Sequence, residues 1–270
     1  MPLLAMCSVK GAPGVTTAAL GLAAVADTWA RVVLVECDPA GGDLMLRHGL
    51  AAKPSLVDLA SAARGTGGDP AVYEAVTQEL ALGDRVAPVV VAPPGGAQSR
   101  AALPELTRAG QLVLSPPGRL VVADCGRFEV SSPARPVLAL ADVVAVQVRA
   151  TADGLAHVRE HLAELLDVVT GRLVVLLGHG GLYGEADVAE VLGRHLAEEL
   201  MAPDADVTVL GPLPEDRQAA ALLSGGLVAG RRWQRLPLLR ALQGVAGELA
   251  PLLVTAPHDE AAGARAETAG

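Results

Sequence analysis

Apolar residues fall into short runs that alternate with longer stretches of helical periodicity. The runs VVLVE, PVVVA, LVVAD, VVAVQV and RLVVLL are apolar at nearly every position, which is typical of strands that helices cover on both faces. The pattern predicts strands over Leu3–Val9, Val32–Cys37, Val86–Val91, Leu120–Asp124, Val143–Val148, Leu173–Leu177 and Val207–Leu210. It predicts helices near residues 15–28, 54–63, 70–81, 99–110, 152–168, 184–200, 215–224 and 234–253. This alternation indicates an α/β fold of three layers, α/β/α, around a mostly parallel sheet of about seven strands.

The chain has 270 residues, of which 51% are apolar, so it can bury a full core. We expect one domain over 1–255, because the glycine-rich loops RGTGGDP and APPGGA are too short to separate two domains. Residues 256–270 are small and polar and lack an apolar period, which predicts a disordered tail.

The charge balance bears on possible partners. A formal charge of −9 disfavours nucleic-acid binding by the molecule as a whole, although a local basic patch remains possible. The N-terminus has no basic leader, and its apolar run is too short for a signal peptide or a membrane span, so we expect a cytoplasmic protein.

Two groups of potential metal ligands are better explained without a metal. Cys7, Cys37 and Cys125 form no CxxC pair, and we expect reduced thiols buried in the core. His157 and His161 have the i, i+4 spacing of a zinc pair, but HVREH lacks the HExxH order, which favours a solvated helix face.

The segment KGAPGVTT, residues 10–17, lies between an apolar run, LLAMCSV, and a helical stretch, AALGLAAVA. A glycine loop followed by a helix N-terminus offers backbone N–H groups to a phosphate without any side chain. Gly11 and Gly14 give the backbone its freedom, and Thr16 stands where a hydroxyl would bind Mg²⁺. Val15, however, stands where a phosphate loop normally carries lysine. The alternative is a strand-to-helix turn that binds nothing.

Two acidic residues follow predicted strands. Asp38, in VECDPAGGD, and Asp124, in LVVADCGRF, both lie where parallel strands end, which is where open α/β sheets bind ligands. Asp38 is placed to order a water or a hydrated metal, or else to cap a turn ahead of two glycines. Asp124 has the arrangement of a Walker B acid that reaches Mg²⁺ through water. A loop and two acids at three strand ends make a turn without function an unlikely explanation.

In the order of these motifs, over about residues 3–250, the chain resembles the MinD/ParA family of P-loop ATPases, the group with a deviant Walker A motif. The resemblance implies a P-loop NTPase fold and an ATP·Mg²⁺-dependent homodimer that acts as a positioning or assembly switch. Such switches serve cell division, chromosome partitioning or the placement of cellular machinery, and they act through a protein partner that the sequence does not identify.

The resemblance also implies roles for individual residues. Lys10 would reach the partner subunit's phosphates and, with Asp38, would take part in hydrolysis. Asp38 would orient water, and Thr16 and Asp124, with Asp38, would hold Mg²⁺. The segment GPLPEDRQAAALLSGG resembles the family's segment beside the base, which contributes Pro212 and Pro214. The phosphates would be cradled by Lys10, Gly11, Ala12, Pro13, Gly14, Val15, Thr16 and Thr17.

Three departures from the family pattern matter: Val15 replaces the loop lysine, Ala12 replaces a glycine, and Gly178–His179 stand where an asparagine is usual near the adenine. Losing an ammonium that offsets developing phosphate charge affects hydrolysis more than binding. We therefore expect ATP binding with weak or absent hydrolysis. A pseudo-ATPase that serves only as a protein-interaction scaffold is the alternative.

A basic segment near the C-terminus, GRRWQRLPLLR, contains Arg231, Arg232, Arg235 and Arg240 around Trp233. In ParA-like proteins such residues hold DNA nonspecifically, which makes a DNA-binding partitioning protein a further alternative. On an acidic protein, ordinary capping and solvation of the last helix is the preferred explanation of these residues. The sequence after this segment contains proline and several acids, so we expect no direct membrane insertion.

Overall fold

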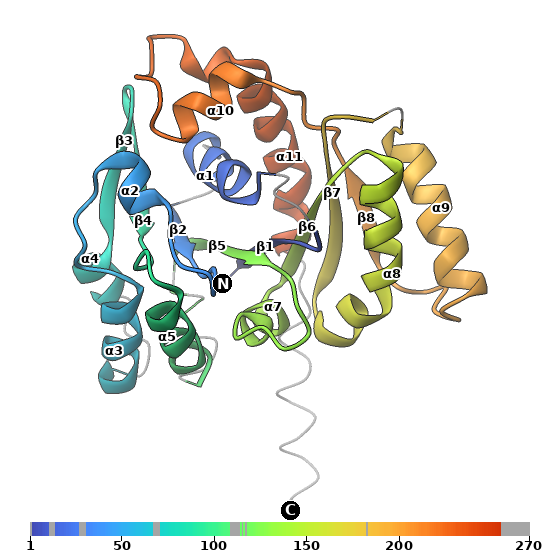
Figure 1. The fold of residues 1–270 in the computed structure, drawn as a ribbon, viewed down its shortest axis with the longest axis horizontal. Helices are drawn as coiled ribbons and strands as arrows, with labels where there is room; N and C mark the ends of the chain where they lie inside the picture. Colours follow the sequence, from blue (N-terminus) through green and yellow to red (C-terminus); the bar gives the residue numbers. More distant parts are fainter. Residues whose placement is uncertain are drawn as a thin grey trace, which may run out of the picture.

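One sheet runs through the molecule (Figure 1). The computed structural model describes residues 2–10, 14–26, 31–66, 71–108, 114, 116, 118–181 and 183–254. Within these residues the sheet has eight strands in the order β3-β4-β2-β5-β1-β6-β7-β8, and all neighbouring pairs except β3 and β4 are parallel. The strands are β1 (Leu3–Ser8), β2 (Val32–Glu36), β3 (Gln78–Leu82), β4 (Arg85–Val90), β5 (Leu120–Arg127), β6 (Val143–Arg149), β7 (Arg172–Gly178) and β8 (Val207–Leu210).

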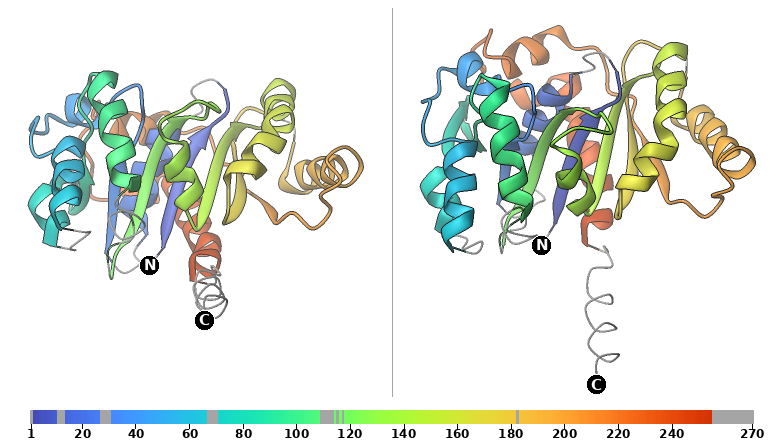
Figure 2. Two further views of the ribbon diagram at one scale, coloured as in Figure 1. Left: turned by 90° about the horizontal axis from the view of Figure 1, so that it is seen from below. Right: turned by 60° about the horizontal axis from the view of Figure 1, so that its bottom comes forward.

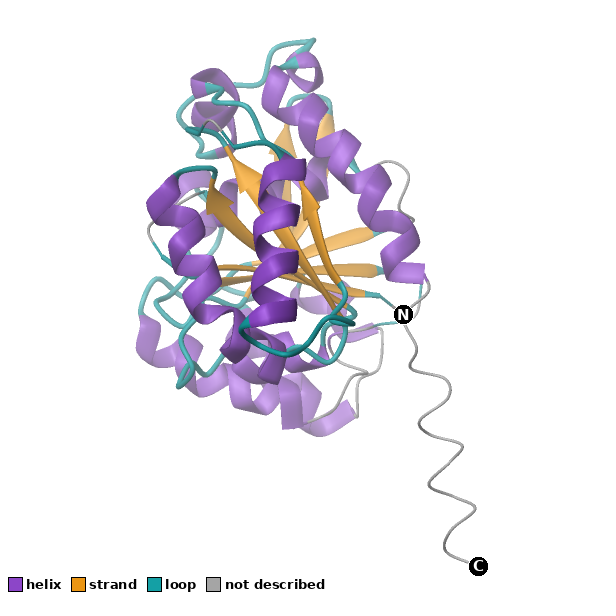
Figure 3. Cartoon of the chain, turned by 90° about the vertical axis from the view of Figure 1, so that its right-hand side faces the viewer, coloured by secondary structure: helices purple, strands orange, loops and turns teal. Residues whose placement is uncertain are grey.

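Helices cover both faces of the sheet, as Figures 2 and 3 show. One face packs against α3 (Leu56–Thr66), α4 (Ala71–Val76), α5 (Gly96–Arg108), α7 (Arg135–Leu140), α8 (Ala152–Val168) and α9 (Glu185–Glu198). The other packs against α1 (Val15–Val25), α2 (Leu44–His48), α10 (Arg217–Leu223), the 3-10 turn η1 (Trp233–Arg235) and α11 (Pro237–Val254). The predicted three-layer α/β/α fold with a mostly parallel sheet is therefore confirmed.

The continuous apolar strands explain why two layers form. Alternate residues of a strand point to opposite faces, so an all-apolar run buries a set of side chains on each side. In β1, Leu3 and Ala5 join the core under α3 to α9, whereas Leu4 and Met6 join the core under α1 and α11. Close packing on the second face depends on Gly21, where a Cβ would collide with Leu242 of α11.

The helix predicted over 70–81 is wrong in its second half. The structure has α4 only to Val76 and then the antiparallel edge strand β3, which accounts for eight strands rather than seven. In β3, Leu80 and Leu82 are buried while Glu79 and Ala81 are exposed, and this period of two belongs to a strand with one covered face. Gly83, at φ +65°, turns the chain into β4.

The helices α2 and α7 were not predicted, because each has only five or six residues and too little sequence for a helical period. The predicted tail, 256–270, lies outside the described residues, so the single domain over 1–255 stays a prediction. None of the helices in the described ranges is long and apolar enough to cross a membrane.

Candidate functional site

The loop after β1 leads into α1 at the carboxyl edge of the sheet. Of its predicted cradle, Lys10, Gly14, Val15, Thr16 and Thr17 are described, and Gly11, Ala12 and Pro13 lie outside the described residues. Gly14, the N-cap residue of α1, has the left-handed φ of +98° that favours glycine, and it provides no side-chain cap. Because the first N–H groups of a helix have no partner within it, α1 presents uncapped donors at this edge.

Val15 belongs to the core. Its side chain is 6% exposed and packs in the apolar layer shared with α1 and α11. The position that carries lysine in a usual phosphate loop therefore contributes packing and no charge.

Asp124 lies near the end of the central strand β5 and is 2% exposed. Its Oδ1 accepts a hydrogen bond from the Gly126 N–H at 3.1 Å, and the Thr16 hydroxyl lies near enough to favour the charged form of the carboxylate. Burial raises the pKa of Asp124 to about 7, and the nearby Glu36 and Asp38 carboxylates add to the rise. Thr16 and Asp124, predicted from separate motifs, are thus neighbours at this edge of the sheet.

Asp38 follows β2 and reaches the same place. Its Oδ1 accepts the Ala40 N–H at 2.7 Å, so the turn-capping role considered from the sequence is real. Partial burial raises its pKa. A Cβ on Gly126 would collide with the Asp38 carboxylate, so the glycine after Cys125 lets Asp38 approach the end of β5. Thr16, Asp38 and Asp124 therefore converge.

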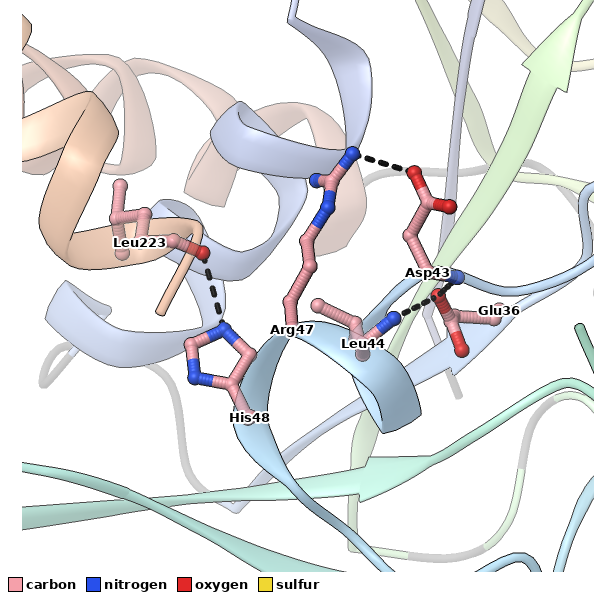
Figure 4. A network of polar contacts seen from close by, with 6 residues as sticks. All are labelled: Glu36, Asp43, Leu44, Arg47, His48 and Leu223. Carbon is pink, nitrogen blue, oxygen red and sulfur yellow. Dashed lines mark hydrogen bonds and ion pairs between the residues drawn. The ribbon is translucent and has the colours of Figure 1, made fainter. Parts of the chain in front are cut away.

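Glu36 is a buried carboxylate that the sequence interpretation did not assign. Its Oε1 accepts the N–H groups of Asp43 at 2.8 Å and Leu44 at 3.0 Å (Figure 4). Its Oε2 accepts the Ala92 N–H at 2.9 Å. These bonds join the ends of β2 and β4 to the start of α2. Burial raises the pKa of Glu36. The signal was available: VVLVE places a glutamate in a fully apolar run, where a charge needs partners.

Around Glu36 the chain is closely fitted. A Cβ on Gly42 would collide with the Glu36 carboxylate. In α2, Arg47 forms an ion pair with Asp43, and His48 Nε2 lies 3.1 Å from the carbonyl oxygen of Leu223 in α10 (Figure 4). The segment AGGD after Asp38 thus serves mainly to connect β2, α2 and α10.

A cavity of about 240 Å³ opens beside the start of α1. It lies between the first turn of α1, the ends of β6 and β7, and the segment from β8 into α10. Pro214 lines it and Pro212 does not. Across the cavity wall, His179 Nδ1 lies 3.8 Å and Arg217 Nε 3.5 Å from the Glu215 carboxylate. The lining residues are Gly14, Thr17, Ala18, Gln147, Arg149, Gly178, His179, Leu213, Pro214, Glu215, Asp216, Arg217, Ala220 and Leu238.

Lys10 is exposed, and its Nζ lies 2.8 Å from Nε2 of His157 in α8. Since an ammonium can only donate, His157 accepts with an unprotonated nitrogen. His161 contacts Glu164 at 2.8 Å instead of sharing a ligand with His157. The described residues include no group of three or more His, Cys, Asp and Glu side chains that could hold a metal alone.

The other candidates lie as follows. Cys7, Cys37 and Cys125 are free and fully buried in one core layer, which confirms the predicted core thiols, and burial raises the pKa of Cys7 to about 12.

Trp233 is buried and donates to Asp84 Oδ1 at 3.0 Å, so it does not present a stacking surface. The side chains of Arg231, Arg232, Arg235 and Arg240 are exposed.

Scans of the sequence against protein-family models and against curated proteins find no match. Solved structures do match. The ParA family ATPase from Chlorobium tepidum TLS is 14% identical with a TM-score of 0.68, and the match covers 92% of this chain and 98% of that one. The cell division ATPase MinD of Pyrococcus furiosus is 16% identical with a TM-score of 0.66, over 93% and 99% of the two chains. The chain has the MinD/ParA fold.

A third similar structure was determined with a nucleotide. The septum site-determining protein MinD from Pyrococcus horikoshii OT3, complexed with Mg-ADP, is 18% identical with a TM-score of 0.62, over 93% of this chain and 96% of that one. Identities this low establish the MinD/ParA fold of the chain, and the residues at the sheet edge must carry any argument about function.

Proposed function

We propose that the chain is a MinD/ParA-like ATP-binding protein that dimerises around ATP·Mg²⁺ and acts as a positioning or assembly switch in the cytoplasm. The observation that carries the proposal is the convergence of the Thr16 hydroxyl, the Asp124 carboxylate and Asp38 beside the start of α1. A buried carboxylate such as Asp124, with the half-buried Asp38 beside it, needs a cation to be favourable in charged form. The similar MinD structure holds Mg-ADP, which supports the same ligand class here.

Thr16, Asp38 and Asp124 suit a nucleotide-bound Mg²⁺ ion. Hydroxyl and carboxylate oxygens suit Mg²⁺, which usually takes its remaining ligands from phosphates and water and so needs no protein cage. Bound Mg²⁺ would offset the charge of the phosphates and of Asp38 and Asp124. Thr16 and Asp124 would hold it, Asp38 would orient a water, and the first N–H groups of α1 would bind phosphate oxygens. The cavity between Thr17, His179 and Pro214 would take the nucleoside.

We expect little or no hydrolysis. Val15 is buried in the core and brings no charge to the phosphates. The Lys10 ammonium is held by His157 of the same chain, and in a dimer it would leave that contact for the partner subunit's phosphates. Binding relies on backbone donors and on Mg²⁺, whereas turnover also needs the transition-state charge to be offset.

Calorimetric titration with ATP and Mg²⁺ tests the proposal. We expect binding in the micromolar to millimolar range that Asp124→Ala abolishes, with Asp204→Ala, an exposed aspartate far along the chain, as the matched control. No heat of binding at millimolar ATP would reject a nucleotide-binding function and leave the interaction scaffold.

Dimerisation is tested separately by sedimentation with ATP. Lys10→Ala is expected to shift the balance toward monomer, and Lys53→Ala, an exposed lysine after α2, is the control. Equal monomer fractions for wild type and Lys10→Ala would remove the role of Lys10 across the dimer.

Nonspecific DNA binding is a second candidate, favoured by the exposure of Arg231, Arg232 and Arg235 on one short segment. It predicts ATP-stimulated retention of DNA that falls with salt and with neutralisation of the three arginines. Retention that survives neutralisation would rule out this segment as the contact.

A further inference from the structure

Arg149 is the last residue of β6, and it lines the same cavity as Gly14 and Thr17. Gln147 and Arg149 are two positions apart on one strand, so their side chains leave the same face. That face is the one toward α1, because a Cβ on Gly14 would lie 3.8 Å from Gln147 Nε2. Arg149 begins about 7 Å farther along the strand, beyond the sheet edge and beside the start of α1.

The backbone of Arg149 is held in place. Arg149 pairs with Gly178 in the register of β6 and β7, and its carbonyl oxygen accepts the Thr151 N–H at 2.8 Å. Gly154 packs against this carbonyl so closely that a Cβ there would lie 2.5 Å from its oxygen. The base of the side chain is thus fixed at the rim of the cavity.

Arg149 is an exposed residue, and no hydrogen bond or ion pair within the described part of the chain engages its guanidinium. Arg217, the other arginine that lines the cavity, is paired with Glu215 at 3.5 Å. Arg149 is therefore the lining arginine that a ligand can engage without breaking an ion pair.

We infer that Arg149 binds the phosphates of the nucleotide from within the same chain, and so replaces part of the charge that Val15 does not provide. A guanidinium donates paired hydrogen bonds to phosphate oxygens, which suits it to this role. The inference rests on the proposed nucleotide binding and narrows it: Arg149 adds to the backbone donors and Mg²⁺ a side-chain contact that favours nucleoside di- and triphosphates over the nucleoside.

The test is a calorimetric comparison of ATP, ADP and adenosine on full-length wild type, Arg149→Ala, Arg149→Gln and Arg149→Lys. Arg194→Ala is the control, because Arg194 is an exposed arginine on α9 outside the cavity. We expect ATP affinity to fall about ten-fold or more in the Ala and Gln variants, and to recover partly with Lys. Adenosine and the control should be unaffected, and the loss should shrink at high salt.

Failures of the two ideas are distinguishable. ATP binding by wild type with equal affinity in Arg149→Ala and Arg149→Gln overturns the inference alone. An equal loss for ATP and adenosine also overturns it, because the residue would then act on the nucleoside or on the fold. No ATP binding by wild type overturns the proposed function and the inference with it. Thermal unfolding of each variant shows whether a loss of affinity reflects a loss of structure.

Discussion

Glu36 and Asp124 are both buried carboxylates at the carboxyl edge of the sheet, and they are direct neighbours in the register of β2 and β5. Their surroundings differ. Glu36 accepts three backbone N–H groups from α2 and the end of β4, whereas Asp124 accepts one backbone N–H and has the Thr16 hydroxyl nearby. The oxygens of Glu36 are thus engaged by backbone donors. Asp124 has fewer donors, lies near Thr16 and Asp38, and can accept a cation. A buried acid with enough fixed donors supports the fold, and one without them is a candidate for ligand binding.

Removing Glu36 should have the largest effect. Glu36→Ala leaves the N–H groups of Asp43, Leu44 and Ala92 buried without their acceptor, at about 1–3 kcal/mol each, so we expect a loss of about 4–6 kcal/mol in the free energy of unfolding. Urea unfolding measures it, with Glu79→Ala on the exposed side of β3 as the control. A loss no larger than that of the control would mean that these donors find other acceptors.

Unlike Glu36→Ala, removing the charge of Asp124 should raise the free energy of unfolding near neutral pH. The pKa of Asp124 is raised from its ordinary 3.8 to about 7, so the folded state keeps a proton that the unfolded state loses. The stability this gives is present below pH 4 and is lost as the pH rises through 7. Over this window the cost is about 4 kcal/mol at about 1.36 kcal/mol per pKa unit.

Asp124→Asn keeps an oxygen for the Gly126 N–H and has no charge. We expect the nucleotide-free variant to be more stable than wild type above pH 7, by up to about 4 kcal/mol, and no more stable near pH 4. Urea unfolding in EDTA from pH 4 to 8 measures the difference, and Asp204→Asn is the control. Equal pH dependence in Asp124→Asn and wild type would show that the carboxylate is ionised without a cation.

Gly126 leaves room for the Asp38 carboxylate to lie near Asp124, so a substitution there tests the Asp124 side of the comparison with Glu36. Gly126→Ala combines a left-handed φ of +61° with a collision with the Asp38 carboxylate, and we expect a loss of about 2–3 kcal/mol together with weaker nucleotide binding. Gly118→Ala is the matched control, since Gly118 has φ +75° and an added Cβ there would meet no atom of the described residues within 4 Å. Its loss should be about 1 kcal/mol, from backbone strain alone. Equal losses would mean that Asp38 moves aside freely.

The sequence was sufficient for the layers of the fold, because all-apolar runs such as VVAVQV leave a strand no exposed face. It was also sufficient to bring Thr16, Asp38 and Asp124 together, since parallel strands end at one edge. It was not sufficient for β3, where the period of two spans only five residues and follows a helix directly. Short windows of this kind fit both structures.

The roles of Glu36, Gly126 and Arg149 depend on contacts between segments distant in the chain. Glu36 and Ala92 are 56 positions apart, and nothing local to either residue shows that they meet. Arg149 is one exposed arginine among many in the sequence, and only the cavity it lines distinguishes it. The roles of such residues can be recognised only once the three-dimensional structure is known.

Substitutions at Val15 should change the free energy of unfolding least. They also test the missing loop cation, which would offset phosphate charge near Asp124. Val15→Lys places an ammonium where the side chain is packed among apolar groups, so the lysine must turn outward and leave its packing behind. We expect a loss of about 1–2 kcal/mol without nucleotide, compared with a smaller one for Val15→Met, which stays apolar. ATP·Mg²⁺ should offset most of the loss in the lysine variant, because phosphates would then receive the ammonium, and phosphate release should rise above that of wild type. If nucleotide stabilises the Lys and Met variants equally and phosphate release stays at the wild-type rate, a missing loop cation does not limit turnover, and the arrangement of Asp38 and its water becomes the step to test.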